Sequence, residues 1–262
     1  MLRPRIIPCL LVHNKGLVKT VRFATPKYVG DPINAVKIFN EKEVDELIVL
    51  DIDATVQARD PDYTLIRNVA SECRMPLCYG GGIRSVEHAV SIIKLGVEKV
   101  AIGAASVEDP EIVTGIARAV GRQSVAVVLD AREAGKSGKY EVWTRNGTRN
   151  SKRDPVSLAR EAVERGAGEI TLNCIDRDGM MTGYDLDLAE RIRAAVNVPM
   201  TVLGGAGKHS DIEALLARIG IAGAAAGSLF VFKGVYKAVL ISYPERNVKE
   251  AFTRAAVAGA AS

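Results

Sequence analysis

The chain has 262 residues, 48% of them hydrophobic and 25% charged, and its 35 basic and 31 acidic residues give a net charge of +4. This composition is ordinary for a globular protein, and no apolar run approaches the ~18 residues that a membrane-spanning helix needs. The weak basic excess is not interleaved with aromatic residues, so we expect neither a nucleic-acid partner nor a membrane.

The four cysteines, Cys9, Cys73, Cys78 and Cys174, show no CxxC spacing. Three of them lie inside apolar runs typical of strands, which predicts buried thiols. The apolar stretch near the N-terminus is too short for a secretion signal. We therefore expect a cytoplasmic protein.

Short runs typical of β-strands alternate with helical patterns along the chain. Asp31-Pro32 and Asp154-Pro155 each combine an N-cap residue with proline at the first helical position, and Ser85 precedes a helical pattern that ends at a glycine. Eight β-α units in about 250 residues predict a closed (β/α)8 TIM barrel, with a doubly wound open sheet as the alternative. The predicted strands are residues 5–10, 46–52, 76–82, 98–104, 124–130, 168–175, 199–205 and 221–227.

A repeat divides the chain into two similar halves. ELIVL at 46–50 resembles EITLN at 169–173, an offset of 123 residues (169 minus 46), and the proline before YGGGIRS matches the proline before VLGGAGKHS. An open sheet has no reason to repeat in this way, so the repeat favours a barrel. We expect a single domain over 1–262, with half-barrels at about 1–120 and 121–240 and a frayed tail at about 245–262.

Two glycine clusters follow the third and seventh predicted strands, and a turn of small residues follows the next strand in each half. Glycine lets backbone N–H groups approach an anion, and a helix N-terminus adds a favourable dipole. The pair of clusters predicts a ligand with a phosphate at each end, although glycines that only permit tight turns are the alternative. The candidate phosphate-binding residues are Gly81, Gly82, Gly103 and Ala104 in one half, and Gly204, Gly205, Ala226, Gly227 and Ser228 in the other.

Acidic residues follow three of the predicted strands at the same rim. They are Asp51, Asp130 and Asp176, with Asp53 and Asp178 close by in sequence. Carboxylates at strand ends act as general acids or bases, or they cap helices and brace loops. Asp130 ends an apolar strand with nothing obvious to cap, so it ranks first as a reactive group.

Other chemistries find no support in the sequence. The three histidines, His13, His88 and His209, form no HxH or HExxH motif, and GxSxG is absent. We therefore expect no metal and no organic cofactor.

RIIPCL, GDPINA, VDELIVLDIDA, YGGGIRS, the DRDG turn with its GYD, and LGGAG occur in this order. Together they resemble the cyclase subunit of imidazole glycerol phosphate synthase from histidine biosynthesis, over about residues 3–240. The resemblance implies a half-barrel-repeat barrel in a heterodimer with a glutaminase subunit at the barrel bottom. It also implies that ammonia travels up the barrel to a bis-phosphate substrate at the mouth.

The chain departs from this family at its mouth. The resemblance implies catalytic aspartates at the ends of strands 1 and 5; the second is Asp130, whereas the first position holds Leu11. Leucine cannot transfer a proton, and such a group is worth roughly 100- to 10,000-fold in rate. The resemblance also implies a polar pair after strand 4 that helps to hold one phosphate. In this chain Gly103 and Ala104 occupy those two positions. The resemblance implies site roles for Lys19, in a mobile loop after strand 1, and for Asp51 and Asp176.

The barrel bottom keeps the family pattern. The resemblance implies that two basic and two acidic residues form a charged gate to the ammonia tunnel. The matching residues are Arg5, Glu46, Lys99 and Glu169, and we expect them to pair with one another.

Three hypotheses follow. PKYVGDPINA, GSLFVF and AVLISYP are similar to a divergent copy of the family found in bacterial surface-polysaccharide gene clusters. That similarity implies that ammonia passes to a third protein, an amidotransferase that makes an acetamidino sugar for O-antigen. The alternatives are an ordinary cyclase in which Asp51 substitutes for the missing carboxylate, and a scaffold that only docks and activates the glutaminase. The loop 133–153, with Trp143, is a candidate partner contact.

Overall fold

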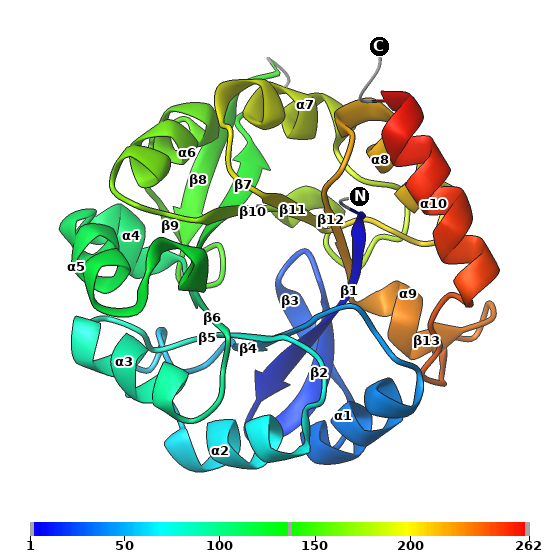
Figure 1. Ribbon diagram of the computed structural model, residues 1–262, viewed down its shortest axis with the longest axis horizontal. Coiled ribbons are helices and arrows are strands. Elements are labelled where there is room, and N and C mark those ends of the chain that lie inside the picture. The colour runs from blue at the N-terminus through cyan, green and yellow to red at the C-terminus, as the bar shows by residue number, and fades with distance from the viewer. Residues whose placement is uncertain (1–2, 136–137, 260–262) are drawn as a thin grey trace.

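Eight parallel strands close into a barrel, with helices around the outside (Figure 1). The computed structural model describes residues 3–135 and 138–259. Closure follows from the pairing of β7 with β10 and of β12 with β1, which excludes the open-sheet alternative. The (β/α)8 prediction is therefore confirmed. The barrel strands, in order around the ring, are β1 (Arg5–His13), β4 (Leu47–Asp51), β5 (Leu77–Gly80), β6 (Lys99–Ile102), β7 (Val125–Glu133), β10 (Glu169–Cys174), β11 (Met200–Leu203) and β12 (Gly223–Ala226).

The helices begin where the sequence predicts caps. The Asp31 carboxylate accepts a hydrogen bond from the Asn34 N–H at the start of α1, and Asp154 does the same for the Ser157 N–H in α6. The Ser85 hydroxyl caps α3 in the same way. The helices are α1 (Pro32–Glu41), α2 (Tyr63–Glu72), α3 (Val86–Lys94), α4 (Ala104–Glu108), α5 (Glu111–Val120), α6 (Pro155–Glu164), α7 (Leu186–Ala195), α8 (His209–Ile219), α9 (Ser228–Val231) and α10 (Arg246–Gly259), with short 3-10 turns at Arg122–Ser124 and Ile175–Arg177.

The offset of 123 found in the sequence has structural counterparts. Asp62 caps α2 through the Leu65 N–H, and Asp185 caps α7 through the Leu188 N–H. Gly81 and Gly204, which differ by the same offset, both have positive φ angles of 122° and 93°. A Cβ at either position would collide with the backbone carbonyl of the neighbouring strand. These matches support the predicted half-barrel plan.

The barrel interior and the outer core are separate apolar clusters, because side chains on each strand alternate between the two faces. Residues such as Ile6, Val49 and Ile170 point outwards and pack under the helices. The inward-facing cluster is Ile7, Cys9, Ile48, Cys78, Ala101, Ala126, Val128, Leu203 and Ala225, with Leu11 and Leu50 partly buried against it. Cys9, Cys78 and Cys174 are buried free thiols, as predicted, while Cys73 is half-buried.

The segment after the first barrel strand is a β-hairpin, so the prediction of a mobile loop in this segment is corrected. β1 continues past Leu11 to His13, turns, and returns as β2 (Gly16–Val21), which pairs with β3 (Ala24–Gly30). Asn14 and Lys15 have positive φ angles at the turn. Leu17 and Val18 bury their side chains, which holds the hairpin against the barrel and places Lys19 inside the protein with 5% exposure.

A second hairpin forms most of the segment predicted as the loop 133–153. β7 extends to Glu133 and pairs with β8 (Tyr140–Thr144), which pairs with β9 (Arg149–Asn150); residues 136–137 lie outside the described part. Trp143 lies opposite Asp130 in this pairing, and the Arg132 guanidinium lies 4.6 Å from its ring centroid.

The tail expected to fray is instead a helix over most of its length. α10 packs against α8, with Phe252 and Ala256 fully buried, and the Lys249 ammonium lies 2.6 Å from the Asp45 carboxylate. The apolar side chains of the tail therefore have a partner surface, which the local sequence does not reveal. Residues 260–262 lie outside the described part.

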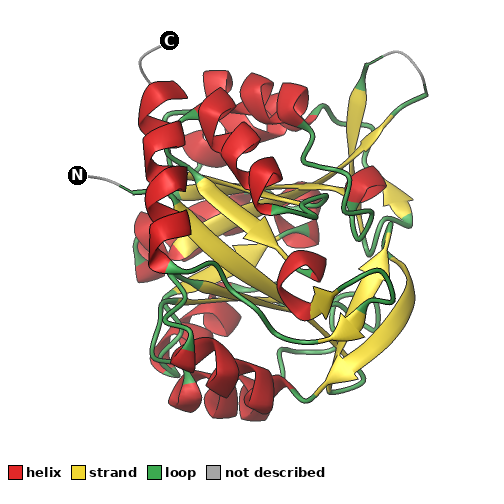
Figure 2. Cartoon of the chain, turned by 90° about the vertical axis from the view of Figure 1, so that its right-hand side faces the viewer, coloured by secondary structure: helices red, strands yellow, loops and turns green. Residues whose placement is uncertain are grey.

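Figure 2 shows strand hairpins at the end of the molecule opposite to α10. A small third hairpin follows α9, made of β13 (Phe232–Lys233) and β14 (Ala238–Val239). Within residues 3–135 and 138–259, no helix has the length and apolarity needed to cross a membrane.

Candidate functional site

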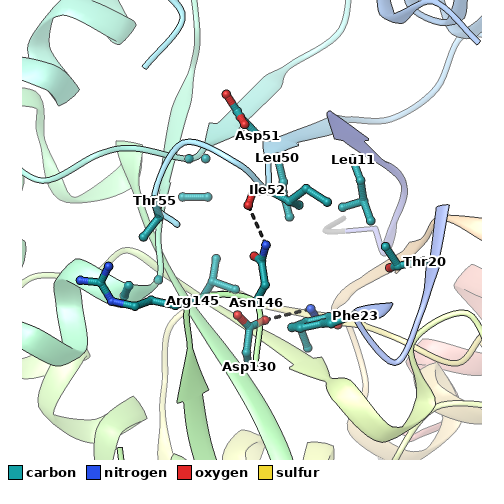
Figure 3. Close-up of a pocket in the computed structure, with 17 residues that line it drawn as sticks. Leu11, Thr20, Phe23, Leu50, Asp51, Ile52, Thr55, Asp130, Arg145 and Asn146 are labelled. Carbon is teal, nitrogen blue, oxygen red and sulfur yellow. Dashed lines mark hydrogen bonds between the residues drawn. The ribbon is translucent and has the colours of Figure 1, made fainter. Parts of the chain in front are cut away.

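Three cavities adjoin one another across the C-terminal mouth of the barrel. The central one has a volume of about 130 Å³, and its lining includes Leu11, Asp130 and Asn173 (Figure 3). A cavity of about 150 Å³ shares Gly81 and other residues with it, and a cavity of about 40 Å³ shares Leu11 and Asn173. The mouth is therefore one groove with a glycine cluster at each end, as the sequence predicts.

Asp130 lies in the middle of this groove. The Asn173 side-chain amide donates a 2.9 Å hydrogen bond to the Asp130 carboxylate. Burial raises the pKa of Asp130 to about 7, the Asn173 hydrogen bond opposes this, and the nearby Asp178 carboxylate adds to it. Asp130 can therefore hold or release a proton close to neutral pH. The Oδ1 atom of Asn173 is buried and has no partner among the described residues.

Leu11 occupies the opposite side of the groove. β1 and β7 are four steps apart around the eight-strand ring, so Leu11 and Asp130 face each other across the mouth. Leu11 pairs in register with Leu50 of β4, and both side chains pack against the apolar interior. The groove thus has an apolar wall where a second proton-transfer group would face Asp130.

The first glycine subsite contains cations that the sequence analysis did not identify. Gly81, Gly82, Gly103 and Ala104 line the 150 Å³ cavity, as predicted. The turn between β8 and β9 adds Arg145, whose guanidinium makes two 3.1 Å hydrogen bonds to Glu108. Arg59 and Arg84 complete the basic lining. The only sequence signal for Arg145 is its place in the segment 133–153, which was predicted as a partner contact and not as part of a phosphate site.

The second glycine subsite includes Lys19. Gly204, Gly205, Ala226, Gly227 and Ser228 line the smallest cavity together with this lysine. The Lys19 ammonium donates a 2.5 Å hydrogen bond to the Cys9 carbonyl, and a Cβ at Gly227 would lie 2.6 Å from Lys19 Nζ. Burial lowers the pKa of Lys19, and the neighbouring Cys9 and Asp178 oppose the change. The hairpin therefore places a cation at this end of the groove.

Of the remaining acidic residues, Asp51 and Asp178 line the groove. Asp51 lines the central cavity, but its carboxylate accepts hydrogen bonds from the Asp53 and Ala54 N–H groups at 2.9 and 3.1 Å, and burial raises its pKa. Asp178 lines the second subsite and accepts a 2.7 Å hydrogen bond from the Thr20 hydroxyl. Burial raises the pKa of Asp178.

Asp176 lies apart from the other two acids. It lies outside the three mouth cavities and lines a separate pocket with Arg22 and Tyr140. Its carboxylate accepts a 2.9 Å hydrogen bond from the Glu133 N–H, so it braces the start of the second hairpin. The short 3-10 turn at Ile175–Arg177 directs Asp176 outwards and Asp178 inwards, a difference that depends on backbone geometry.

Four buried or half-buried charges form a ring at the opposite end of the barrel. Arg5 and Lys99 each pair with both Glu46 and Glu169, and the Lys99 ammonium lies 2.5 Å from Glu46 and 2.8 Å from Glu169. Thr201 donates a 2.5 Å hydrogen bond to Glu169. The predicted mutual pairing is therefore present.

The ring holds the Glu169 carboxylate ionised. Burial by itself would raise the pKa of Glu169, but Arg5 and Lys99 lower it to about 2. Burial and the neighbouring Arg5 lower the pKa of Lys99, but Glu169 and Glu46 together hold it above its ordinary value. Glu169 and Lys99 are therefore both charged at neutral pH.

Between the charged ring and the mouth, the barrel interior is lined by apolar and thiol side chains. An apolar interior strongly disfavours a charged ammonium ion and tolerates a small neutral molecule. No group of three or more His, Cys, Asp or Glu side chains suited to a metal ion occurs within the described residues.

Comparison with known proteins relates this geometry to a family. The family described as "Histidine biosynthesis protein" matches residues 5–237. The "Putative imidazole glycerol phosphate synthase subunit HisF" of Leptospira interrogans is 53% identical over 251 residues, which cover 96% of this chain and 99% of that protein. A like-named subunit of Vibrio vulnificus, hisF3, is 56% identical over 250 residues, covering 95% and 96%. The "Imidazole glycerol phosphate synthase subunit HisF" of Hyphomonas neptunium is 41% identical over 232 residues, covering 88% and 91%.

Proposed function

The chain belongs to the histidine biosynthesis protein family, among the HisF cyclase subunits of imidazole glycerol phosphate synthase, and from that premise we propose that it relays ammonia without cyclising a substrate. Ammonia enters from a glutaminase subunit at the charged ring and leaves at the mouth. A separate acceptor enzyme consumes it there.

The observation that carries the proposal is the contrast between the two ends of the barrel. The ring of Arg5, Lys99, Glu46 and Glu169 is complete, with every member paired. At the mouth, by contrast, Leu11 stands opposite Asp130, at the position where the family resemblance implies a second catalytic carboxylate. This contrast supports an entrance for ammonia at one end of the barrel and no second proton-transfer group at the other.

The apolar interior supports the transport step. Ammonia that leaves a glutaminase as neutral NH₃ passes the inward-facing cluster without the desolvation cost that ammonium would incur. The ring admits it through a rearrangement of one ion pair, for which Arg5 is suited because its side chain is 28% exposed. Glu46 and Glu169 remain compensated by Lys99 during that step.

At the mouth, Asp130 meets the emerging ammonia. Its pKa of about 7 allows the carboxylate to accept a hydrogen bond from NH₃ or, once protonated, to donate one. Leu11 and Leu50 form an apolar wall beside it. In the relay, Asp130 orients ammonia and does not complete a ring closure.

The acceptor that we propose is an amidotransferase that converts an N-acetyl sugar to an acetamidino sugar for a surface polysaccharide. The support is the resemblance of three segments, PKYVGDPINA, GSLFVF and AVLISYP, to the divergent branch of the family. The first and last of these segments contribute to the β2–β3 and β13–β14 hairpins.

The test is a cyclase assay with ammonium chloride and the bis-phosphate aminoimidazole substrate of the histidine pathway. We expect wild type to be inactive while it still raises the activity of its glutaminase partner. Leu11→Asp should gain cyclase turnover by at least about 100-fold, since it restores a positioned carboxylate. Leu11→Asn, which has the same size but transfers no proton, should not gain it.

The assay also separates the alternatives. Cyclase turnover by wild type at a rate typical of the family would favour a histidine-pathway cyclase, for which the glycine subsites and the pKa of Asp130 are the supporting observations. A scaffold that only activates the glutaminase would pass no ammonia through the barrel.

A further inference from the structure

The most exposed large hydrophobic side chains of the described residues lie on two hairpins at the mouth. Tyr236, Val235 and Tyr28 are 94%, 90% and 67% exposed, more than any other large hydrophobic residue that is described. Val21, Val239 and Leu240, in the same two segments, are 42%, 47% and 51% exposed. Scattered exposed residues need no explanation, whereas a cluster of them marks an interaction surface.

The charge of the same hairpins is strongly one-sided. Residues 14–30 contain four basic residues and no acidic one, and residues 228–244 contain two basic residues and no acidic one. The rest of the chain therefore carries 29 basic residues (35 minus 6) and 31 acidic ones. Five of the six cations are exposed, and none of these five forms an ion pair with a described residue. They are Lys15, Arg22, Lys27, Lys233 and Lys237.

The two hairpins touch each other and border the groove. The Lys27 ammonium lies 5.2 Å from the centroid of the Phe232 ring, which joins β3 to β13. Phe23, in the turn between β2 and β3, lines both the central cavity and the second subsite. The β13–β14 hairpin follows α9, whose first residue, Ser228, lines the second subsite. The surface is therefore continuous with the point where ammonia would emerge.

We propose that these two hairpins form the docking surface for an acidic, partly apolar face of the ammonia-accepting enzyme. This inference rests on the proposed function. An acceptor must cover the mouth if ammonia is to reach it without release, and the unpaired cations beside the groove complement an acidic face. Tyr28, Val235 and Tyr236 supply the apolar anchors of such an interface. An anionic membrane would also suit basic and aromatic side chains, but it provides no second active site for ammonia.

The experiment measures binding of the full chain, in complex with its glutaminase, to a purified amidotransferase that makes an acetamidino sugar. Two variants alter exposed residues of the β13–β14 segment, Val235→Ser/Tyr236→Ser and Lys233→Glu/Lys237→Glu. We expect each to weaken binding by about tenfold or more, and we expect the wild-type affinity to fall when salt is raised from about 50 to about 300 mM. The matched control, Lys42→Glu/Lys94→Glu, reverses two exposed lysines on the helical wall and should leave acceptor binding unchanged.

A second readout distinguishes misfolding from loss of docking. Both hairpin variants should still activate the glutaminase as wild type does, because the charged ring lies at the other end of the barrel. Equal affinity of wild type and both variants for the acceptor would contradict the proposed docking surface, but it would leave the proposed ammonia relay standing. No wild-type binding to the acceptor would overturn both.

Two other occupants are tested in parallel. Binding to vesicles of phosphatidylcholine with one quarter phosphatidylglycerol tests for a membrane. Sedimentation of the chain alone tests for a second copy of the chain. Binding to either that is lost in the hairpin variants, without acceptor binding, would assign the surface to that occupant and contradict the proposal.

Discussion

Leu11 and Asp130 face one another across the barrel mouth, on strands β1 and β7, and line the same cavity. One side of the cavity therefore carries a carboxylate that titrates near neutral pH, and the other carries a side chain that cannot titrate. This asymmetry separates the mouth from that of an acid–base catalyst that uses two carboxylates. At the opposite end of the barrel, all four members of the charged ring are paired.

The raised pKa of Asp130 should appear in the pH dependence of stability. Its folded pKa of about 7 exceeds the ordinary value of about 3.9, so the folded state binds an extra proton between these pH values. The stabilising contribution is fully present below about pH 4 and is lost as the pH rises through 7. Relative to Asp130→Asn, wild type should therefore lose up to about 4 kcal/mol between pH 4 and pH 8 in urea unfolding.

A direct titration checks the cause. Asn173→Leu removes the hydrogen bond that opposes the shift, so the midpoint of Asp130 should rise further in side-chain carbon-13 NMR. A wild-type midpoint below about 5 would show that burial does not control this carboxyl.

The charged ring should give the opposite pH dependence. The pKa of Glu169 is about 2, so its contribution is present above the unfolded value of about 4.3 and is lost as the pH falls towards 2. Glu169→Gln should lower the free energy of unfolding by about 2 to 4 kcal/mol at pH 7, because Arg5 and Lys99 lose a partner, and by much less near pH 2. Denaturant unfolding at both pH values measures this. Glu164→Gln, on the exposed face of α6, is the control, and equal losses in the two variants would refute a special role for the ring.

The helix starts could be predicted because each depends on residues that are local in the sequence. Asp31, Asp154 and Ser85 cap their helices from the positions that the sequence indicated. The ring residues came from the family resemblance, and the structure shows the mutual pairing that was expected of them.

The hairpin after β1 and the last helix were missed for different physical reasons. Leu17 and Val18 are both buried, so β2 lacks the alternation of buried and exposed residues that predicts a strand. The family resemblance implied a mobile loop in this segment, and the prediction followed it. α10 depends on burial of Phe252 and Ala256 against α8, a contact far away in the sequence. Asp176 and Asp178 differ in direction because of a short 3-10 turn, which no spacing rule resolves.

Lys19 should control anion binding at the second subsite. We expect inorganic phosphate to raise the melting temperature of wild type and to have little effect on Lys19→Met, since the buried ammonium is the cation closest to Gly227. Thermal unfolding with increasing phosphate is the measurement, and Lys94→Met, on the exposed end of α3, is the matched control. Equal stabilisation of all three proteins would place phosphate elsewhere.

Arg145 should control the first subsite, with Glu108 as its competitor. Because Glu108 holds the Arg145 guanidinium through two hydrogen bonds, Glu108→Gln should free this cation and tighten binding of the bis-phosphate ligand by about tenfold. Arg145→Gln should weaken binding by a similar factor. Calorimetric titration of both variants measures the changes, and a decrease in affinity for Glu108→Gln would mean that the ion pair builds the subsite.

The central claim is that ammonia reaches the acceptor through the barrel. The most direct measurement supplies the assembled glutaminase, this chain and the sugar amidotransferase with glutamine labelled by nitrogen-15 in its amide, in the presence of excess unlabelled ammonium chloride. The relay predicts that the acetamidino product carries predominantly nitrogen-15, and that Glu169→Gln reduces this enrichment. A product whose label matches the bulk ammonium would contradict the relay.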